Sequence, residues 1–201
     1  MSWNVPNILT VLRLLAAPGV AVMFLYFNRP YADWFALILF ISAALTDWID
    51  GHLARSWKQV TKIGTMLDPI ADKAMVVIAL VVITGYSGMN PWLILPATVI
   101  LFREVFVSGL REYLGDTAGL LKVTKLAKWK TTFQMLAIAV LFLGTGLGYV
   151  ENTQERVLRW TSSEATIAGL ILIWIAAALT FVTGLDYFLK ALPHLKGSKD
   201  D

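Results

Sequence analysis

The chain contains no cysteine and few charged side chains, and each shortage excludes a class of protein. Without cysteine, a secreted scaffold held together by disulfides is impossible. Charged residues make up only 15% of the 201 residues, whereas hydrophobic residues make up 57%. This composition excludes intrinsic disorder and does not fit an ordinary soluble domain. Together with the mean hydropathy of +0.66, it predicts an integral membrane protein.

Long apolar segments account for most of the chain. Six of them have about 18 to 25 residues, which is enough to cross a hydrocarbon core roughly 30 Å thick. They lack the alternating pattern of barrel strands, so we predict an all-α membrane protein with six transmembrane helices. No basic stretch precedes the first segment, which is too long for a signal peptide and is expected to be retained. The segments lie near residues 8–27, 34–54, 67–85, 92–110, 130–150 and 166–189.

The connectors between these segments are short and leave no room for a second domain. We therefore expect a single membrane domain over residues 1–196, followed by a polar tail at 197–201. No internal repeat is visible. Gly144 and Gly148 form a GxxxG pattern, which favours ordinary helix packing over a dimer interface.

The basic residues are distributed unevenly between the two sides of the predicted bundle. If the amino terminus is cytoplasmic, only Arg29, Arg156 and Arg159 of the 17 lysines and arginines face outward. The positive-inside rule then predicts that both termini are cytoplasmic. The basic residues lie in loops and form no continuous tract, which favours anionic lipid headgroups over nucleic acid as their partners.

Four aspartates lie in or beside two neighbouring apolar segments. On a helix that turns about 100° per residue, Asp47 and Asp50 share one side, and Asp68 and Asp72 share a side of the next helix. The short connector is expected to bring these sides face to face at the cytoplasmic end. Unpaired carboxylates near hydrocarbon are costly, so a cation must compensate for them. Oxygen ligands from two helices suit Mg²⁺ or Mn²⁺, in a two-metal site, better than zinc.

Small residues accompany the aspartates. Gly51 and Ala54 lie on the same side as the first aspartate pair, and Gly64 lies near the second pair. Small residues often serve tight helix packing in membranes. Beside four aspartates and Arg55, we interpret them as space for a flat or phosphorylated group to approach the backbone. His52 lies between these positions, where a peripheral polar role is expected.

From Asp47 to Asp72 the chain resembles the complete signature of the CDP-alcohol phosphatidyltransferase family. The matching positions are Asp47, Asp50, Gly51, Ala54, Arg55, Gly64, Asp68 and Asp72. Three further stretches, at 4–13, 103–112 and 128–135, resemble motifs of the bacterial phosphatidylglycerophosphate synthases within this family. The resemblance extends to about Leu143 and does not include residues 151–164.

The resemblance implies a homodimer in the bacterial inner membrane, with its active site facing the cytoplasm. Such an enzyme would transfer a phosphatidyl group from CDP-diacylglycerol to sn-glycerol 3-phosphate and release CMP. Two Mg²⁺ or Mn²⁺ ions would be held by Asp47, Asp50, Asp68 and Asp72, and Asp72 would also be the catalytic base. The CDP-lipid site would contain Gly51, Ala54, Arg55, Gly64, Asn7 and Thr10.

An acceptor that carries a phosphate requires cationic side chains. Arg103 and Arg111 are eight residues apart and therefore lie on one side of a helix, and Lys125 and Lys130 follow in the next cytoplasmic segment. Such cations suit a phosphate dianion. Arg111 and Lys130 lie in the motif-like stretches and are the preferred acceptor ligands.

Three alternatives stay open at this point. A sister enzyme that uses inositol phosphate, serine or phosphatidylglycerol as acceptor would share the aspartate motif. An ion transporter would be expected to carry its aspartates near the midplane, often with inverted repeats. A purely structural membrane scaffold would leave the four aspartates unexplained.

Overall fold

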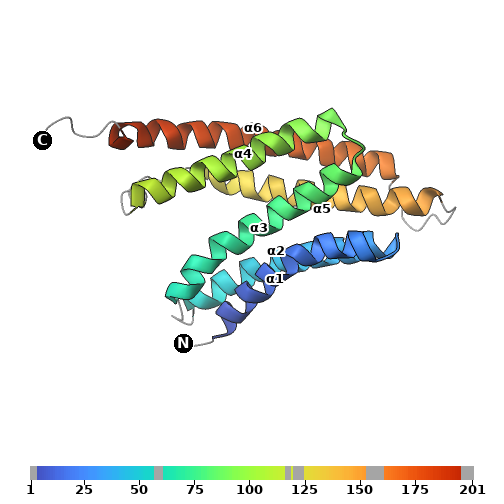
Figure 1. The fold of residues 1–201 in the computed structure, drawn as a ribbon, viewed down its shortest axis with the longest axis horizontal. Coiled ribbons are helices and arrows are strands. Elements are labelled where there is room, and N and C mark those ends of the chain that lie inside the picture. The colour runs from blue at the N-terminus through green and yellow to red at the C-terminus, as the bar shows by residue number, and fades with distance from the viewer. Residues whose placement is uncertain (1–3, 57–60, 116–118, 120–124, 153–160, 196–201) are drawn as a thin grey trace, which may run out of the picture.

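The structure, a computed structural model, describes residues 4–56, 61–115, 119, 125–152 and 161–195. Side chains are described throughout these ranges except at 47–56, 125, 127–128 and 152. The all-helical prediction is confirmed over these ranges, and each predicted apolar segment coincides with one helix. The helices are α1 (Val5–Tyr26), α2 (Tyr31–Ser56), α3 (Lys62–Tyr86), α4 (Pro91–Leu114), α5 (Lys125–Asn152) and α6 (Ser162–Leu195) (Figure 1).

Short polar side chains fix where several helices begin. Asn4, Thr61 and Asn90 each accept a hydrogen bond from a backbone amide of the following helical turn, at 3.0 to 3.1 Å. Before α6, the Thr161 amide donates to the Glu164 carboxylate and the Glu164 amide donates to the Thr161 hydroxyl. These caps satisfy amides that have no partner within the helix, which matters most in a membrane.

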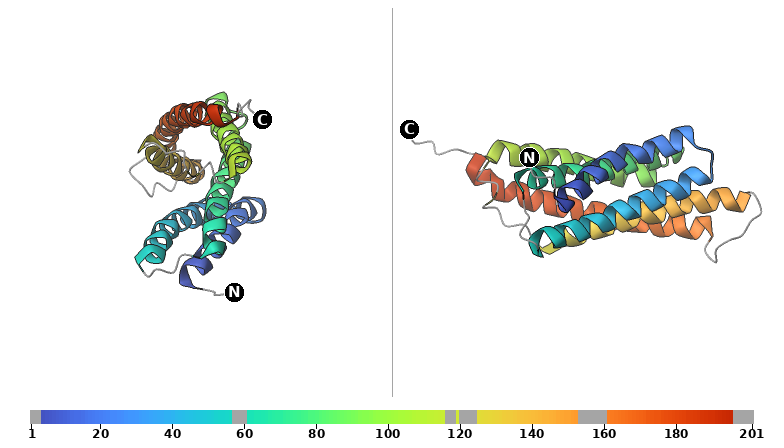
Figure 2. Two further views of the ribbon diagram at one scale, coloured as in Figure 1. Left: turned by 90° about the vertical axis from the view of Figure 1, so that its left-hand side faces the viewer. Right: turned by 90° about the horizontal axis from the view of Figure 1, so that it is seen from below.

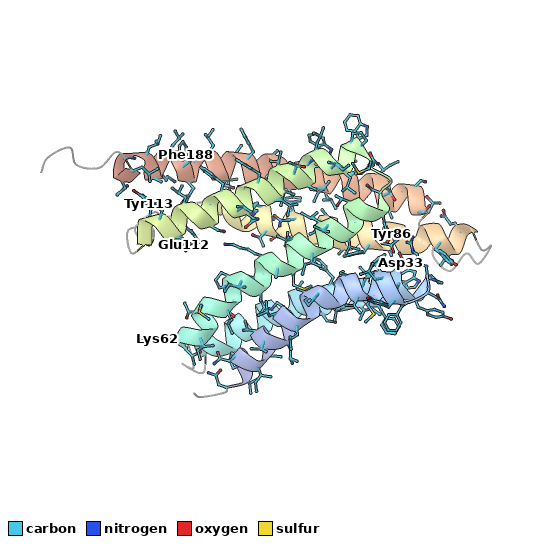
Figure 3. All side chains as sticks on the ribbon, in the orientation of Figure 1. Asp33, Lys62, Tyr86, Glu112, Tyr113 and Phe188 are labelled. Atoms are coloured by element: carbon cyan, nitrogen blue, oxygen red, sulfur yellow. The ribbon has the colours of Figure 1, made fainter. Side chains whose placement is uncertain are left out.

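Successive helices run in opposite directions, so α1, α3 and α5 begin at the end where α2, α4 and α6 finish (Figure 1). We call this the proximal end, and it is marked by Lys62, Glu112 and Phe188 in Figure 3. The opposite, distal end is marked by Asp33 and Tyr86 (Figure 3). The last turns of α2 and the first turns of α3, which carry the aspartate motif, both lie at the proximal end.

The six helices form two groups of three. Seen end-on, α1, α2 and α3 lie together and α4, α5 and α6 lie together (Figure 2). The groups meet chiefly where α2 packs against α5, and α3 also contacts α4 and α5. Their shared core contains large buried side chains from all six helices, including Phe40, Leu80, Phe142 and Ile173. This core fixes the position of α3, and with it the first group, relative to α4, α5 and α6.

An arginine clamp closes the distal end. The Arg29 guanidinium donates to the Asp33 carboxylate, which is fully buried, and to the Thr145 carbonyl oxygen at 3.2 Å. It also lies 5.1 Å from the ring centroid of Tyr86. The hydrogen bond to Asp33 raises the pKa of Arg29 above its ordinary value. The clamp therefore joins the turn between α1 and α2 to the distal ends of α3 and α5.

Within the described ranges, four helices are long and apolar enough to cross a membrane. They are α1, α4, the Trp129–Glu151 part of α5, and α6. Large apolar side chains such as Leu15, Phe102 and Phe181 lie more than half exposed on their outer surfaces. Lipid is the solvent that such surfaces require, so the protein is a membrane protein.

Candidate active site

The first half of α3 presents two aspartates one helical turn apart. Thr61 caps this helix by accepting a hydrogen bond from the Gly64 amide at 3.0 Å, which places the aspartates in its second and third turns. Both side chains are partly buried, and the Asp72 side chain is 45% exposed. Because they are four residues apart, Asp68 and Asp72 lie on the same side of α3.

A polar face of α1 contacts this part of α3. Asn7, Thr10 and Arg13 recur every three residues and are all buried. The Thr10 hydroxyl donates to Asp68 Oδ1 at 2.7 Å, and Arg13 Nη1 donates to Asp72 Oδ1 at 2.6 Å. One turn earlier, the Thr61 hydroxyl donates to Asn7 Oδ1 at 2.8 Å. The two parallel helices are therefore joined by polar contacts along the proximal half of α1.

Gly64 allows this close approach. A Cβ atom added at Gly64 would lie 2.7 Å from Asn7 Oδ1, closer than real Cβ contacts come. The sequence suggested that Gly64 leaves space for a substrate group, and the structure places the Asn7 side chain against it. The absence of a Cβ at position 64 serves the contact between α1 and α3.

The other half of the aspartate motif lies on α2. This helix continues to Ser56, so Asp47, Asp50, Gly51, Ala54 and Arg55 keep their helical spacing, but their side chains lie outside the described residues. Where side chains are described, no group of three or more Asp, Glu or His could hold a metal ion. Asp68 and Asp72 could contribute two carboxylates to such a site. Their hard oxygen atoms fit Mg²⁺ or Mn²⁺, and the α2 pair would complete the ligand set.

A second polar cluster lies between α4 and α5. The Lys130 ammonium and Arg103 Nη1 both donate to Glu104 Oε1, the latter at 3.3 Å. The side chains of these three residues are between 7% and 18% exposed. From α3, the Lys73 ammonium donates to the Ser108 hydroxyl, which donates to the Glu104 carbonyl oxygen. The cluster thus connects three helices.

Charge in this cluster is unbalanced. Among the described side chains of this cluster, Lys73, Arg103 and Lys130 carry three positive charges against one negative charge on Glu104, which leaves two positive charges. The Arg103 Nε atom is also buried and has no hydrogen-bond partner among the described residues. Unpaired cations are costly within a membrane. The cluster is therefore suited to an anion that carries two negative charges, such as a phosphate monoester.

Arg103 also borders an apolar groove between α4 and α6, with a volume of about 340 Å³. Gly184 on α6 leaves space for the Arg103 side chain, because a Cβ added at Gly184 would lie 2.8 Å from Arg103 Cγ. The other groove residues are Thr98, Val99, Phe102, Phe106, Phe181, Leu185 and Phe188.

The predicted acceptor ligands separate into two places. Arg103 and Lys130 converge on Glu104, whereas the Arg111 guanidinium lies over the Tyr187 ring of α6, 5.3 Å from its centroid. The Lys125 side chain lies outside the described residues. The structure thus brings two of the four predicted residues together.

Sequence reasoning gave no site role to Arg13, Lys73 or Glu104. Arg13 was counted among the basic residues and lies in the motif-like stretch 4–13, and its spacing from Asn7 and Thr10 indicated a polar stripe on an apolar helix. Glu104 gave a weaker indication of a site. A carboxylate in an apolar segment requires a partner, but the sequence does not indicate which residue that partner is. Lys73 directly follows Asp72 and had no pattern of its own.

Comparison with known proteins agrees with the motif. The family model described as CDP-alcohol phosphatidyltransferase matches residues 3–182. A CDP-diacylglycerol–glycerol-3-phosphate 3-phosphatidyltransferase of Cereibacter sphaeroides is 68% identical, in an alignment that covers 99% of this chain and all of the relative. Proteins of the same name from Rickettsia bellii and Haemophilus influenzae are each 38% identical, over 92% and 95% of this chain and 93% and 95% of their own lengths.

Proposed function

Because the chain belongs to the CDP-alcohol phosphatidyltransferase family, we propose that it transfers a phosphatidyl group from CDP-diacylglycerol to sn-glycerol 3-phosphate. The products are phosphatidylglycerophosphate and CMP, so the protein is a transferase of phospholipid biosynthesis. The observation that carries this conclusion is the full-length, 68% identity to a relative that bears the name of this activity.

Members of this family use a divalent metal. We propose that this chain binds two Mg²⁺ or Mn²⁺ ions through Asp47, Asp50, Asp68 and Asp72. The proposal is supported by the half-buried carboxylate pair on α3 and by the matching pair on α2, which ends at the same end of the molecule. When bound, the metal supplies positive charge beside the diphosphate.

The chemistry requires a proton acceptor for the hydroxyl of glycerol 3-phosphate. As this hydroxyl attacks the phosphorus that bears diacylglycerol, its proton must pass to a base, and the bond to CMP must break. We assign the base role to Asp72, whose side chain is 45% exposed at the proximal end. A cysteine intermediate is impossible in this chain, and direct displacement is the simplest course.

Separate parts of the proximal end would recognise the two substrates. Gly51, Ala54, Arg55 and Gly64 would lie against the cytidine diphosphate, with Asn7 of α1 beside them. The cationic cluster of Lys73, Arg103 and Lys130 would hold the phosphate of the acceptor, and its two surplus positive charges match the charge of that group. Arg111 and Lys125 would guide the acceptor from the cytoplasmic side.

The proposed setting is the bacterial inner membrane, with six spans, both termini cytoplasmic and the proximal end facing the cytoplasm. The uneven distribution of lysine and arginine supports this orientation. The alternating directions of the helices agree with it, since they bring the start of α1 and the end of α6 to the same end (Figure 1). We further propose that the enzyme works as a homodimer among membrane lipids.

The function is tested by supplying the purified protein with CDP-diacylglycerol and a panel of acceptors. We expect phosphatidylglycerophosphate and CMP to form with glycerol 3-phosphate, and not with serine, inositol phosphate or phosphatidylglycerol. A product with one of those acceptors instead would assign the chain to a sister activity. Turnover should stop in excess chelator and return with Mg²⁺ or Mn²⁺.

A further inference from the structure

The polar face of α1 contacts the carboxylates, which suggests a role other than substrate binding. We propose that Thr10 and Arg13 are positioning residues that hold Asp68 and Asp72 in the orientation required to bind the metal. This inference rests on the proposed function, because it concerns the metal site of that enzyme. It changes the role that the sequence indicated for Thr10 and gives Arg13 its first role in the site.

Thr10 holds Asp68 through one hydroxyl. Its Oγ1 atom lies 2.7 Å from Asp68 Oδ1 and 3.1 Å from the Pro6 carbonyl oxygen. A hydroxyl has a single proton, and the shorter contact to a charged oxygen is the stronger hydrogen bond. Thr10 is only 2% exposed, so its side chain is enclosed between α1 and α3. These contacts leave it better placed to orient a carboxylate than to meet an incoming lipid headgroup.

Arg13 holds Asp72 in the next turn. Its Nη1 atom lies 2.6 Å from Asp72 Oδ1, and its side chain is 1% exposed while that of Asp72 is 45% exposed. The arginine side chain is therefore enclosed by the protein, whereas nearly half of the carboxylate side chain is exposed. A planar guanidinium fixes direction as well as charge. Arg13 thus determines which way Asp72 points.

Both contacts are made by Oδ1 of the carboxylate. A carboxylate has two oxygen atoms, and a donor that fixes one of them also fixes the plane in which the other lies. Residues that orient metal ligands in this way commonly change metal affinity about tenfold to hundredfold when they are removed. The spacing of three residues on α1 and four on α3 keeps each donor level with its acceptor. One helix therefore orients half of the predicted metal ligands.

The test measures metal binding directly, without substrates. The full chain is purified in detergent, and free Mn²⁺ is followed by electron paramagnetic resonance during titration. Thr10→Val keeps the shape of the side chain but removes the donor, and we expect Mn²⁺ affinity to fall about tenfold to hundredfold. Thr10→Ser keeps a hydroxyl and should restore affinity to within about threefold of the unaltered protein.

Arg13→Lys separates position from charge. The positive charge beside Asp72 is kept, so the repulsion that it exerts on a metal ion is little changed, but the planar contact is lost. A fall in Mn²⁺ affinity of about tenfold or more in this variant therefore reports positioning alone.

Two matched controls distinguish positioning from general damage to the fold. Thr183→Val removes a buried hydroxyl on α6 that bonds the Leu179 carbonyl oxygen at 2.7 Å and contacts no carboxylate among the described residues. Arg29→Lys alters the arginine–aspartate pair at the distal end. Both controls should bind Mn²⁺ as the unaltered protein does.

The outcomes are separable. Mn²⁺ affinity within twofold of the unaltered protein in both Thr10→Val and Arg13→Lys would overturn the proposal. It would also be overturned if Thr10→Val raised only the KM for CDP-diacylglycerol, because Thr10 would then be a ligand of that substrate, or if the unaltered protein bound no Mn²⁺. Failure of the proposed function would give a different result. The unaltered protein would then make no phosphatidylglycerophosphate in the acceptor panel.

Discussion

Asp68 and Asp72 stand one helical turn apart on α3, and each accepts a hydrogen bond from a different residue of α1. A carboxylate at the edge of an apolar bundle keeps its charge only where donors or cations surround it. Arg13 supplies one such charge inside the protein. Beside it, 45% of the Asp72 side chain stays exposed.

The first prediction concerns the base. Asp72→Asn keeps the size of the side chain but removes its capacity to take a proton, so kcat should fall by roughly a hundredfold or more. CDP-diacylglycerol should still bind measurably, because most of the proposed donor contacts remain. Steady-state turnover and binding of the CDP-lipid check the two parts separately. Near-normal turnover would remove Asp72 from the base role.

The second prediction concerns the acceptor phosphate. Arg103→Gln removes one cation from the cluster and leaves the Lys130–Glu104 pair in place. Losing one charge-assisted contact costs about 1.5 to 3 kcal/mol, so kcat/KM for glycerol 3-phosphate should fall roughly tenfold to a hundredfold. The KM for CDP-diacylglycerol should stay within about twofold. Each substrate is varied while the other is held near saturation.

Arg111→Ala, measured in the same way, tests the residue that the sequence favoured. A comparable fall in kcat/KM for the acceptor is expected if Arg111 leaves the Tyr187 ring to meet the incoming phosphate. A loss confined to the CDP-lipid in both variants would show that the acceptor site has been placed wrongly.

At the scale of helices, close packing depends on small residues where two helices meet. Gly144 and Gly148 of α5 face Thr166 and Ser162 of α6. A Cβ added at Gly144 would lie 2.8 Å from Thr166 Oγ1, and one added at Gly148 would lie 3.6 Å from Ser162 Cβ. This confirms the interpretation of their GxxxG pattern as helix packing within the chain. Gly169 of α6 packs in the same interface. The contact between α1 and α3 likewise depends on a glycine, Gly64.

The third prediction tests that contact. Gly64→Ala would place a methyl group 2.7 Å from Asn7 Oδ1, so α1 and α3 must move apart or Asn7 must give up its bond to Thr61. Overpacking of this kind costs about 1 to 3 kcal/mol of unfolding free energy. Thermal unfolding in detergent measures it. Gly85→Ala on the same helix, where a Cβ meets nothing within 4 Å, is the control and should be close to neutral.

The whole molecule is polarised along its long axis. The proximal half carries the aspartates of α3 and the cationic cluster, whereas the distal end holds the Arg29 clamp. Such an arrangement, with the polar site groups in one half of the bundle, suits an enzyme whose substrates are a membrane lipid and a water-soluble phosphate ester. With the proximal end facing the cytoplasm, as proposed, both substrates could reach it without crossing the bilayer.

The fourth prediction tests this orientation in cells. Since the chain has no cysteine, single cysteines can be introduced without background. Ser163→Cys, at the distal end of α6, should react with a membrane-impermeant maleimide from outside, and Ser198→Cys should react only after the cells are opened. The reverse pattern of labelling would overturn the cytoplasmic placement of the proximal end.

The sequence by itself determined the helices and the chemistry of the motif. Apolar length is a local property of the chain, so α1 to α6 could be predicted from local pattern, as could the shared side of Asp68 and Asp72 from helical spacing. Oxygen chemistry likewise follows from residue type, which is why Mg²⁺ or Mn²⁺ could be proposed before any fold was known.

Only the tertiary structure decided which distant side chains meet. Thr10 and Asp68 are 58 residues apart, and Arg13 and Asp72 are 59 apart, so their pairing depends on how α1 packs against α3. The convergence of Lys130 and Arg103 on Glu104, with Arg111 directed to Tyr187, is set in the same way by the packing of α4, α5 and α6. Helical periodicity fixes the side of a helix on which a residue lies, but the neighbour on that side is chosen by close packing of the whole bundle.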